Sequence, residues 1–116
     1  MKSAIVVGGS GGIGRAIVSQ LSELNYEIFT MDKKKPEKLF SKENFFKVNL
    51  LNEKSIVTAI SKIKKRATNL YSLIYTAGIG GDFRTITNVP TSEWDEVIGV
   101  NLKGVYICMR ETLNDF

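Results

Sequence analysis

The chain contains no histidine, one cysteine and only two prolines among its 116 residues. Without histidine, neither a Ser-His-Asp triad nor a Cys-His pair can be assembled, which excludes those two kinds of nucleophilic catalysis. A single cysteine forms no internal disulfide and builds no zinc cluster. A cation held by carboxylates is the alternative, but no sequence feature supports it, so we expect no metal site. Cys108 lies within the apolar run Val105–Met109, and we expect it to be a small buried hydrophobe in a reducing, cytoplasmic protein.

A long apolar run is also missing at the N-terminus, since only four apolar residues lie between Lys2 and the first glycine. We therefore expect neither a signal peptide nor a membrane partner. The net charge is only +4, and the basic residues gather at Lys33–Lys35 and Lys62–Arg66. The second run suits the solvated C-terminal end of a helix, and neither run has interleaved aromatic residues, so we expect no nucleic-acid partner. With 43% hydrophobic and 24% charged residues, we expect residues 1–116 to form one globular domain.

Short apolar runs alternate with amphipathic segments along the chain. Strands are predicted at Ala4–Val7, Glu27–Met31, Phe45–Val48 and Ser72–Tyr75. The first helix has the apolar stripe Ile13, Ile17, Leu21 and Leu24, and the second, capped by Asn52, has Ile56, Ile60, Ile63 and Ala67. The third follows Pro90, is capped by Thr91 or Ser92, and has Trp94, Ile98, Val105 and Cys108 on its apolar side. This pattern predicts an α/β fold, a partial Rossmann-type doubly wound parallel sheet of about four strands in the order 3-2-1-4.

Five glycines lie between the first strand and the first helix, at Gly8, Gly9, Gly11, Gly12 and Gly14. Glycines permit a tight turn and let backbone N–H groups approach a pyrophosphate at a helix N-terminus. Their spacing satisfies G-x-G-x-x-G, G-x-x-G-x-x-G and G-x-x-x-G-x-G, and does not choose among them. The context predicts a dinucleotide site, because Asp32 ends the second strand 18 residues after Gly14, where an acid binds the ribose hydroxyls. A structural turn with a surface acid is the alternative.

The glycine turn Gly8–Gly14, together with Ile74–Ile79 and Gly99–Tyr106, resembles the N-terminal half of the short-chain dehydrogenase/reductase family. The resemblance covers essentially the whole chain. The family's turn is usually T-G-x-x-x-G-I-G and its fourth strand usually ends N-N-A-G, whereas Val7 replaces the Thr and Tyr75-Thr76 replaces the two Asn residues. The resemblance implies an NAD(P)-dependent oxidoreductase that transfers a hydride between nicotinamide and a carbonyl or alcohol substrate.

The resemblance implies a cofactor site made of Gly8, Ser10, Gly12, Ile13, Gly14, Asp32, Asn49, Leu50, Ala77 and Gly78. Asn49 stands where an acid commonly bonds adenine, and its amide would accept there while also donating. We expect NAD rather than NADP, because Asp32 repels a 2′-phosphate although Lys33 attracts it. On the family template, side chains added at Gly12 or Gly14 should be more harmful than alanine at Gly9 or Gly11.

Asn101 lies seven residues after Trp94 and four before Val105, which places a polar amide on an otherwise apolar helix stripe. A buried amide must find partners, and one interpretation is a structural Asn that bonds to the backbone. The resemblance implies a second interpretation, in which Asn101 belongs to a catalytic tetrad, where it organises the active-site helix and a proton-relay water.

The rest of that tetrad is a Ser, a Tyr and a Lys four residues after the Tyr. No tyrosine of this chain is followed by lysine at that spacing, so the resemblance places these residues beyond Phe116. We therefore expect an incomplete domain that is inactive alone and takes a small-molecule substrate only with a C-terminal half. A non-catalytic or vestigial dinucleotide-binding module is the alternative. An open side at the strand Ser72–Tyr75 and at the last helix predicts a homo-oligomer, with Trp94, Val105 and Tyr106 as candidate contacts.

Overall fold

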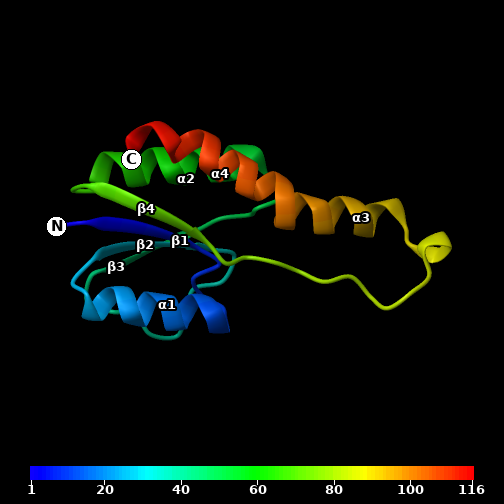
Figure 1. The fold of residues 1–116 in the computed structure, drawn as a ribbon, viewed down its shortest axis with the longest axis horizontal. Coiled ribbons are helices and arrows are strands. Elements are labelled where there is room, and N and C mark those ends of the chain that lie inside the picture. Colours follow the sequence, from blue (N-terminus) through cyan, green and yellow to red (C-terminus); the bar gives the residue numbers. More distant parts are fainter.

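The computed structural model describes residues 1–116 and contains one parallel sheet with helices on both faces (Figure 1). The strands are β1 (Ser3–Val7), β2 (Glu27–Asp32), β3 (Glu43–Lys47) and β4 (Leu70–Tyr75). The helices are α1 (Gly12–Glu23), α2 (Glu53–Arg66), α3 (Thr91–Ile98) and α4 (Gly104–Thr112), with a π-helical turn at Gly99–Lys103 and 3-10 turns at Ile86–Asn88 and Leu113–Asp115. The strand order is β3-β2-β1-β4, which confirms the predicted fold class and order.

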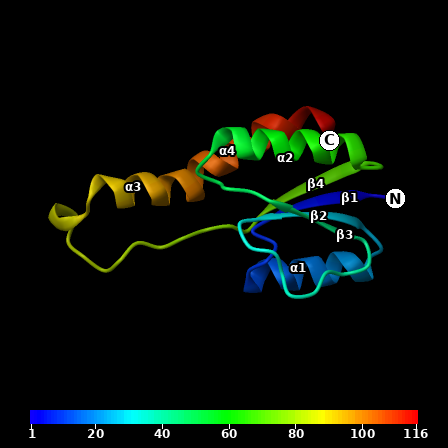
Figure 2. The same ribbon diagram turned by 180° about the vertical axis from the view of Figure 1, so that it is seen from behind.

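The central strand β1 is buried along its whole length. Its side chains alternate between the two faces, as in any strand. Ile5 and Val7 join the cluster formed with α2 and α4, whereas Ala4 and Val6 pack with α1. Figures 1 and 2 show the same three layers, with α1 on one face of the sheet and α2 and α4 on the other. Burial on both faces explains why the sequence of this strand is almost entirely apolar.

The second helix matches its prediction closely. Asn52 is the N-cap of α2, and its Oδ1 accepts the backbone N–H of Ser55 at 3.2 Å. The stripe Ile56, Ile60 and Ile63 is buried, as predicted. A side-chain cap and a regular apolar period are both local features, so both can be read from a short stretch of sequence.

The buried face of α1 differs from the predicted one. Ile13 is 73% exposed and Leu24 is 67% exposed, while the buried residues are Gly14, Val18 and Leu21. The face is rotated because Gly14, rather than Ile13, lies against the backbone of Gly8 and Gly9 in the turn that follows β1. The predicted stripe of α1 was therefore wrong at its two ends.

The third helix was predicted as one long α-helix, but the structure divides it into α3, the π-turn and α4. Its N-cap is Pro90, not Thr91 or Ser92, and no side-chain capping bond forms. Trp94 is 61% exposed, because α3 extends away from the sheet (Figure 1). In contrast, α4 packs beside α2 and buries Cys108 completely. This burial confirms the prediction that Cys108 is a small buried hydrophobe, and it raises the pKa of the thiol to about 12.

The strand and residues predicted to mediate self-association lie mostly at the surface. β4 lies at an edge of the sheet, and Trp94 and Tyr106 are exposed, whereas Val105 is half-buried. Assembly through these residues stays a prediction. None of the helices combines the length and apolar character that crossing a membrane requires.

Glu43, the first residue of β3, has a completely buried side chain. Its carboxylate accepts two hydrogen bonds from the Arg15 guanidinium, at 2.6 and 3.0 Å. It also accepts the Thr30 hydroxyl at 2.6 Å and the backbone N–H of Phe40 at 3.1 Å. The same guanidinium donates to the Gly9 carbonyl at 3.3 Å. This network therefore links β3, β2, α1 and the glycine turn.

Replacing Glu43 by Gln should lower the free energy of unfolding by about 3 kcal/mol at neutral pH, because it leaves the Arg15 charge without its buried partner. Burial alone raises the pKa of Glu43, but the hydrogen bonds from Arg15, Thr30 and Phe40 outweigh it and lower the pKa below its usual 4.5. A carboxyl whose pKa is lower when folded stabilises the fold above its unfolded-state pKa, and this stabilisation is lost as the pH falls through the folded-state pKa.

Urea unfolding measured from neutral pH down to acid should thus show a steeper loss of stability for the unmodified protein than for Glu43→Gln. Glu37→Gln is the control, because Glu37 is an exposed carboxylate. Identical pH profiles for the unmodified protein and Glu43→Gln would contradict the stabilising role of this carboxylate.

Candidate functional site

Three strands end together at one edge of the sheet, beside a cleft of about 250 Å³. β1 ends at Val7, which lies in register with Met31 of β2 and Tyr75 of β4. The Thr76 hydroxyl donates to the Val7 carbonyl at 2.8 Å and ties the end of β4 to the end of β1. β2 and β3 lie on one side of β1, and β4 lies on the other. The carboxyl end of β1 is therefore the point where the strand order reverses. Doubly wound sheets bind their ligands there.

Six of the ten predicted cofactor-binding residues line this cleft, namely Gly8, Asp32, Asn49, Leu50, Ala77 and Gly78. The other four, Ser10, Gly12, Ile13 and Gly14, belong to the glycine turn and the start of α1 but do not line it. Eight further residues line the cleft but were not among the ten predicted cofactor-binding residues, namely Gly11, Lys33, Val48, Leu51, Thr76, Ile79, Glu96 and Val100. Thr76 could have been found from its place just after β4. Glu96 carries no such signal, because its position depends on where α3 lies.

Asp32 connects the glycine turn to the end of β2. One carboxylate oxygen accepts the backbone N–H of Ser10 at 3.0 Å, and the other accepts that of Lys33 at 2.7 Å. Each oxygen has further acceptor capacity. The side chain therefore fixes the turn and can still accept hydrogen bonds from a diol bound in the cleft.

At Gly8 and Gly14, close contacts within the protein leave no room for a side chain. Gly8 has φ +80°, a left-handed conformation, and a Cβ there would lie 2.6 Å from the Ala77 nitrogen. A Cβ at Gly14 would lie 2.7 Å from the Gly9 Cα. Gly12 differs, because a Cβ at this position would meet nothing within 4 Å. Glycine at position 12 therefore leaves open space at the first turn of α1.

Alanine at Gly9 was expected to be milder than a side chain at Gly12 or Gly14, but the contacts around Gly9 do not fit a mild effect. A Cβ at Gly9 would overlap with the Thr30 side-chain methyl and lie 3.2 Å from the Val6 carbonyl oxygen. Thr30 cannot move aside easily, since it is buried and its hydroxyl binds Glu43. At Gly11 the nearest atom would be 3.6 Å away, an ordinary contact that agrees with the expected mild effect.

The turn has unused hydrogen-bond donors. The Ser10 hydroxyl oxygen is buried and has no hydrogen-bond partner. The N-terminus of α1 has neither a side-chain cap nor an acidic residue in its first turn, so its first N–H groups remain without side-chain partners. Buried donors without acceptors are rare in folded proteins. These donors fit the oxygen atoms of a phosphate group, and the acceptors of Asp32 fit a neighbouring ribose.

Asn49 lies at the cleft with part of its amide already engaged. Its Oδ1 accepts the backbone N–H of Leu51 at 3.0 Å, and its own backbone N–H donates to the Ser55 hydroxyl at 3.0 Å. The side-chain NH₂ group and one further lone pair remain available. Donation to a ligand is therefore the readier interaction for this side chain.

Asn101 lies in the π-turn and is exposed, so its predicted burial on an apolar stripe was wrong. The wider π-turn changes the angular spacing on which that stripe was based. The Asn101 amide forms two bonds with the backbone of Ile79: Oδ1 accepts its N–H and Nδ2 donates to its carbonyl, both at 2.8 Å. One N–H and one lone pair of the amide remain unused.

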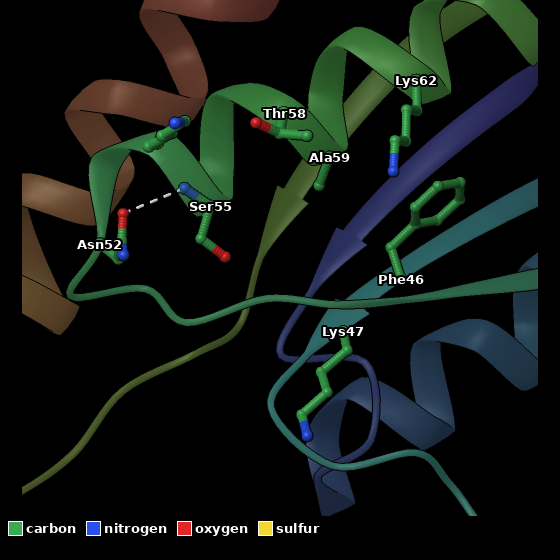
Figure 3. Close-up of a pocket in the computed structure, with 8 residues that line it drawn as sticks. Phe46, Lys47, Asn52, Ser55, Thr58, Ala59 and Lys62 are labelled. Atoms are coloured by element: carbon green, nitrogen blue, oxygen red, sulfur yellow. Dashed lines mark hydrogen bonds between the residues drawn. The ribbon is translucent and has the colours of Figure 1, made fainter.

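A second hollow, of about 340 Å³, lies between β3 and α2. In Figure 3, Lys62 extends from α2 toward Phe46, whereas Lys47 extends away from both. Asn52 and Ser55 bond to each other as part of the helix cap. Because the ammonium groups do not converge, this hollow is a solvated groove and not a defined anion site.

The short chain dehydrogenase family model matches residues 2–116. The chain is 32% identical over 120 residues to the 3-oxoacyl-[acyl-carrier-protein] reductase FabG of Staphylococcus aureus, covering 95% of this chain and 48% of that protein. It is 35% identical over 118 residues to FabG of Rickettsia typhi, covering 97% of this chain and 47% of that protein. The chain thus spans about half the length of the curated relatives it matches.

Solved structures share the fold. The ligand-free aldohexose dehydrogenase of Thermoplasma acidophilum superposes with a TM-score of 0.90 at 26% identity, over 98% of this chain and 44% of that one. The 3-ketoacyl-(acyl-carrier-protein) reductase of Brucella melitensis, complexed with NADH, has a TM-score of 0.91 at 21% identity, over 99% and 50%. ElxO with NADP bound has a TM-score of 0.86 at 24% identity, over 97% and 49%. The family match extends from β1 to the last residue, and the protein therefore belongs to the short-chain dehydrogenase family.

Proposed function

We propose that residues 1–116 bind a dinucleotide as the cofactor-binding part of an NAD(P)-dependent oxidoreductase. The observation that carries this proposal is the arrangement at the carboxyl ends of β1, β2 and β4. The open N-terminus of α1 and the unpartnered Ser10 hydroxyl offer donors, and the Asp32 carboxylate offers acceptors close to them. Donors for phosphate beside acceptors for ribose match the chemistry of a nucleotide more closely than that of an uncharged metabolite.

Each residue of the site has a separate task in this proposal. The α1 N–H groups and the Ser10 hydroxyl hold the pyrophosphate, and Gly12 leaves space for its approach. Asp32 accepts the ribose hydroxyls, and the NH₂ group of Asn49 donates to the adenine ring. When bound, a nicotinamide supplies or takes up the hydride. The chain's own contribution is to fix the dinucleotide across the switch point of the sheet.

Asn101 would act at the nicotinamide end of the site. Its amide is hydrogen-bonded to Ile79, one residue beyond Gly78 in the segment that follows β4. The remaining N–H and lone pair can bind one water molecule, which is the function that the family resemblance implies for this Asn. In this proposal Asn101 orders the helix and a proton-relay water, rather than transferring the hydride itself.

We extend the proposal to a preference for NAD over NADP. Solved relatives contain either kind of cofactor, so the argument comes from the charges of this chain. Asp32 is part of the cleft lining, and a 2′-phosphate on the ribose would meet its negative charge. Lys33 also lines the cleft, but its attraction does not remove that repulsion.

Gly12→Val should weaken NAD binding about 100-fold, because its side chain would fill the space above the N–H groups of the α1 N-terminus. The fold should persist, since the new Cβ meets no protein atom within 4 Å. Titration calorimetry of the folded variant measures the loss. Gly80→Val is the matched control, because a Cβ at Gly80 also meets nothing within 4 Å and Gly80 does not line the cleft. Unchanged NAD affinity in Gly12→Val would show that the turn is not the phosphate site.

Asp32→Asn should narrow the preference for NAD over NADP by about tenfold, because it removes the repulsive charge and keeps an oxygen acceptor. The ratio of the two dissociation constants from calorimetry tests this. Glu37→Gln removes the same charge from an exposed site outside the cleft and should leave the ratio unchanged. Tighter binding of NADP than NAD by the unmodified protein would overturn the proposed preference.

A further inference from the structure

Tyr75, the last residue of β4, reaches the π-turn that carries Asn101. Its hydroxyl donates a hydrogen bond to the carbonyl oxygen of Val100, the residue directly before Asn101. The Tyr75 ring is half-buried and packs against the main hydrophobic core. A strand and a turn that are 25 residues apart in the sequence are thus joined by one side chain.

Gly104 provides the space that this contact needs. Its backbone N–H donates to the Gly99 carbonyl, the bond across five residues that defines a π-turn. A Cβ at Gly104 would overlap with the Tyr75 hydroxyl oxygen and lie 3.4 Å from the Tyr75 Cζ. The hydroxyl therefore occupies the position that a side chain would take, and only glycine allows it to bind Val100.

The segment that follows β4 is connected to the π-turn a second time. Asn101 pairs with both backbone groups of Ile79, four residues after Tyr75. The first connection runs from the Tyr75 side chain of β4 to the π-turn, and the second runs from the Asn101 side chain of the π-turn to the segment after β4. Without the first, the position of Asn101 would depend on the bonds that Asn101 itself makes.

We propose that Tyr75 is a positioning residue, which fixes the π-turn through Val100 and Gly104 and thereby places the Asn101 amide beside Gly78 and Ile79, two residues that line the cleft. The consequence of this positioning for catalysis rests on the proposed function of the site. Tyr75 departs from the family resemblance, which usually has Asn at this position. Burial, with a further contribution from Cys108, raises the pKa of Tyr75 to about 12, so the hydroxyl keeps its proton as a donor at neutral pH.

Tyr75→Phe tests this role, because it removes only the hydroxyl. Nuclear magnetic resonance should show shifted side-chain amide signals of Asn101, assigned by their loss in Asn101→Asp. Hydrogen exchange of the Ile79 N–H should become about fivefold faster, as expected when one supporting hydrogen bond is lost. Tyr71→Phe is the matched control on the same strand, since Tyr71 is 52% exposed and lies at the opposite end of β4 from Tyr75. It should leave both readouts unchanged.

Gly104→Ala gives an independent test. Alone, it should shift the same Asn101 signals and lower the urea midpoint, because its methyl group overlaps with the Tyr75 hydroxyl. Adding Tyr75→Phe should recover part of that midpoint, since the methyl group then faces Cζ at 3.4 Å. A double variant with no recovery would overturn the proposed contact.

The proposal is also overturned if Tyr75→Phe leaves the Asn101 signals in place. It is overturned again if the Ile5 amide, in the core of β1, exchanges faster by the same factor as Ile79, because the effect would then be general destabilisation. Titrating NAD into the unmodified protein in the same experiment tests the function separately. No spectral change with NAD would refute the proposed function, while the response of Asn101 to Tyr75→Phe would still decide the positioning role.

Discussion

The ion pair between Arg15 and Glu43 determines how α1 packs against the sheet. Burying a carboxylate is costly, and four hydrogen bonds, two of them from one guanidinium, offset that cost here. Because the same guanidinium reaches the Gly9 carbonyl, the pair also sets the distance between the glycine turn and β3. The orientation of the α1 N-terminus therefore depends on the Arg15–Glu43 pair, although neither residue lines the cleft.

Asp32 acts on the opposite side of the same turn, through the N–H of Ser10. The turn is thus held by a cation at one carbonyl and by an anion at the next residue's N–H. Such a loop is ordered before any ligand arrives, so little conformational entropy remains to be lost on binding. Gly8 and Gly14 permit the close approach on which both contacts depend, and their role is steric rather than a general need for flexibility.

Much of this architecture could be predicted from local patterns. The apolar run of β1, the regular stripe of α2 and the Asn52 cap each depend on a few neighbouring residues, and the place of Asp32 depends on strand length. Glu43 could not be predicted in this way, because a charged residue beside an apolar run suggests a loop, and its partner lies 28 residues away. The contact of Gly9 with Thr30 and the exposure of Trp94 likewise depend on tertiary placement, which sequence periodicity does not contain.

The residues on the two sides of the cleft differ in how deeply their elements are buried. Val48, directly after β3, and Gly8, in the turn after β1, are both buried, whereas Glu96 reaches the cleft from α3, which contains no buried residue and extends beyond the sheet (Figure 1). Local opening is easiest where few apolar side chains are buried. Entry and departure of a ligand should therefore proceed by displacement of α3, while the sheet stays rigid. The rate of release would then be set by the hinge where α3 joins the π-turn, and the affinity by the glycine turn at the opposite wall.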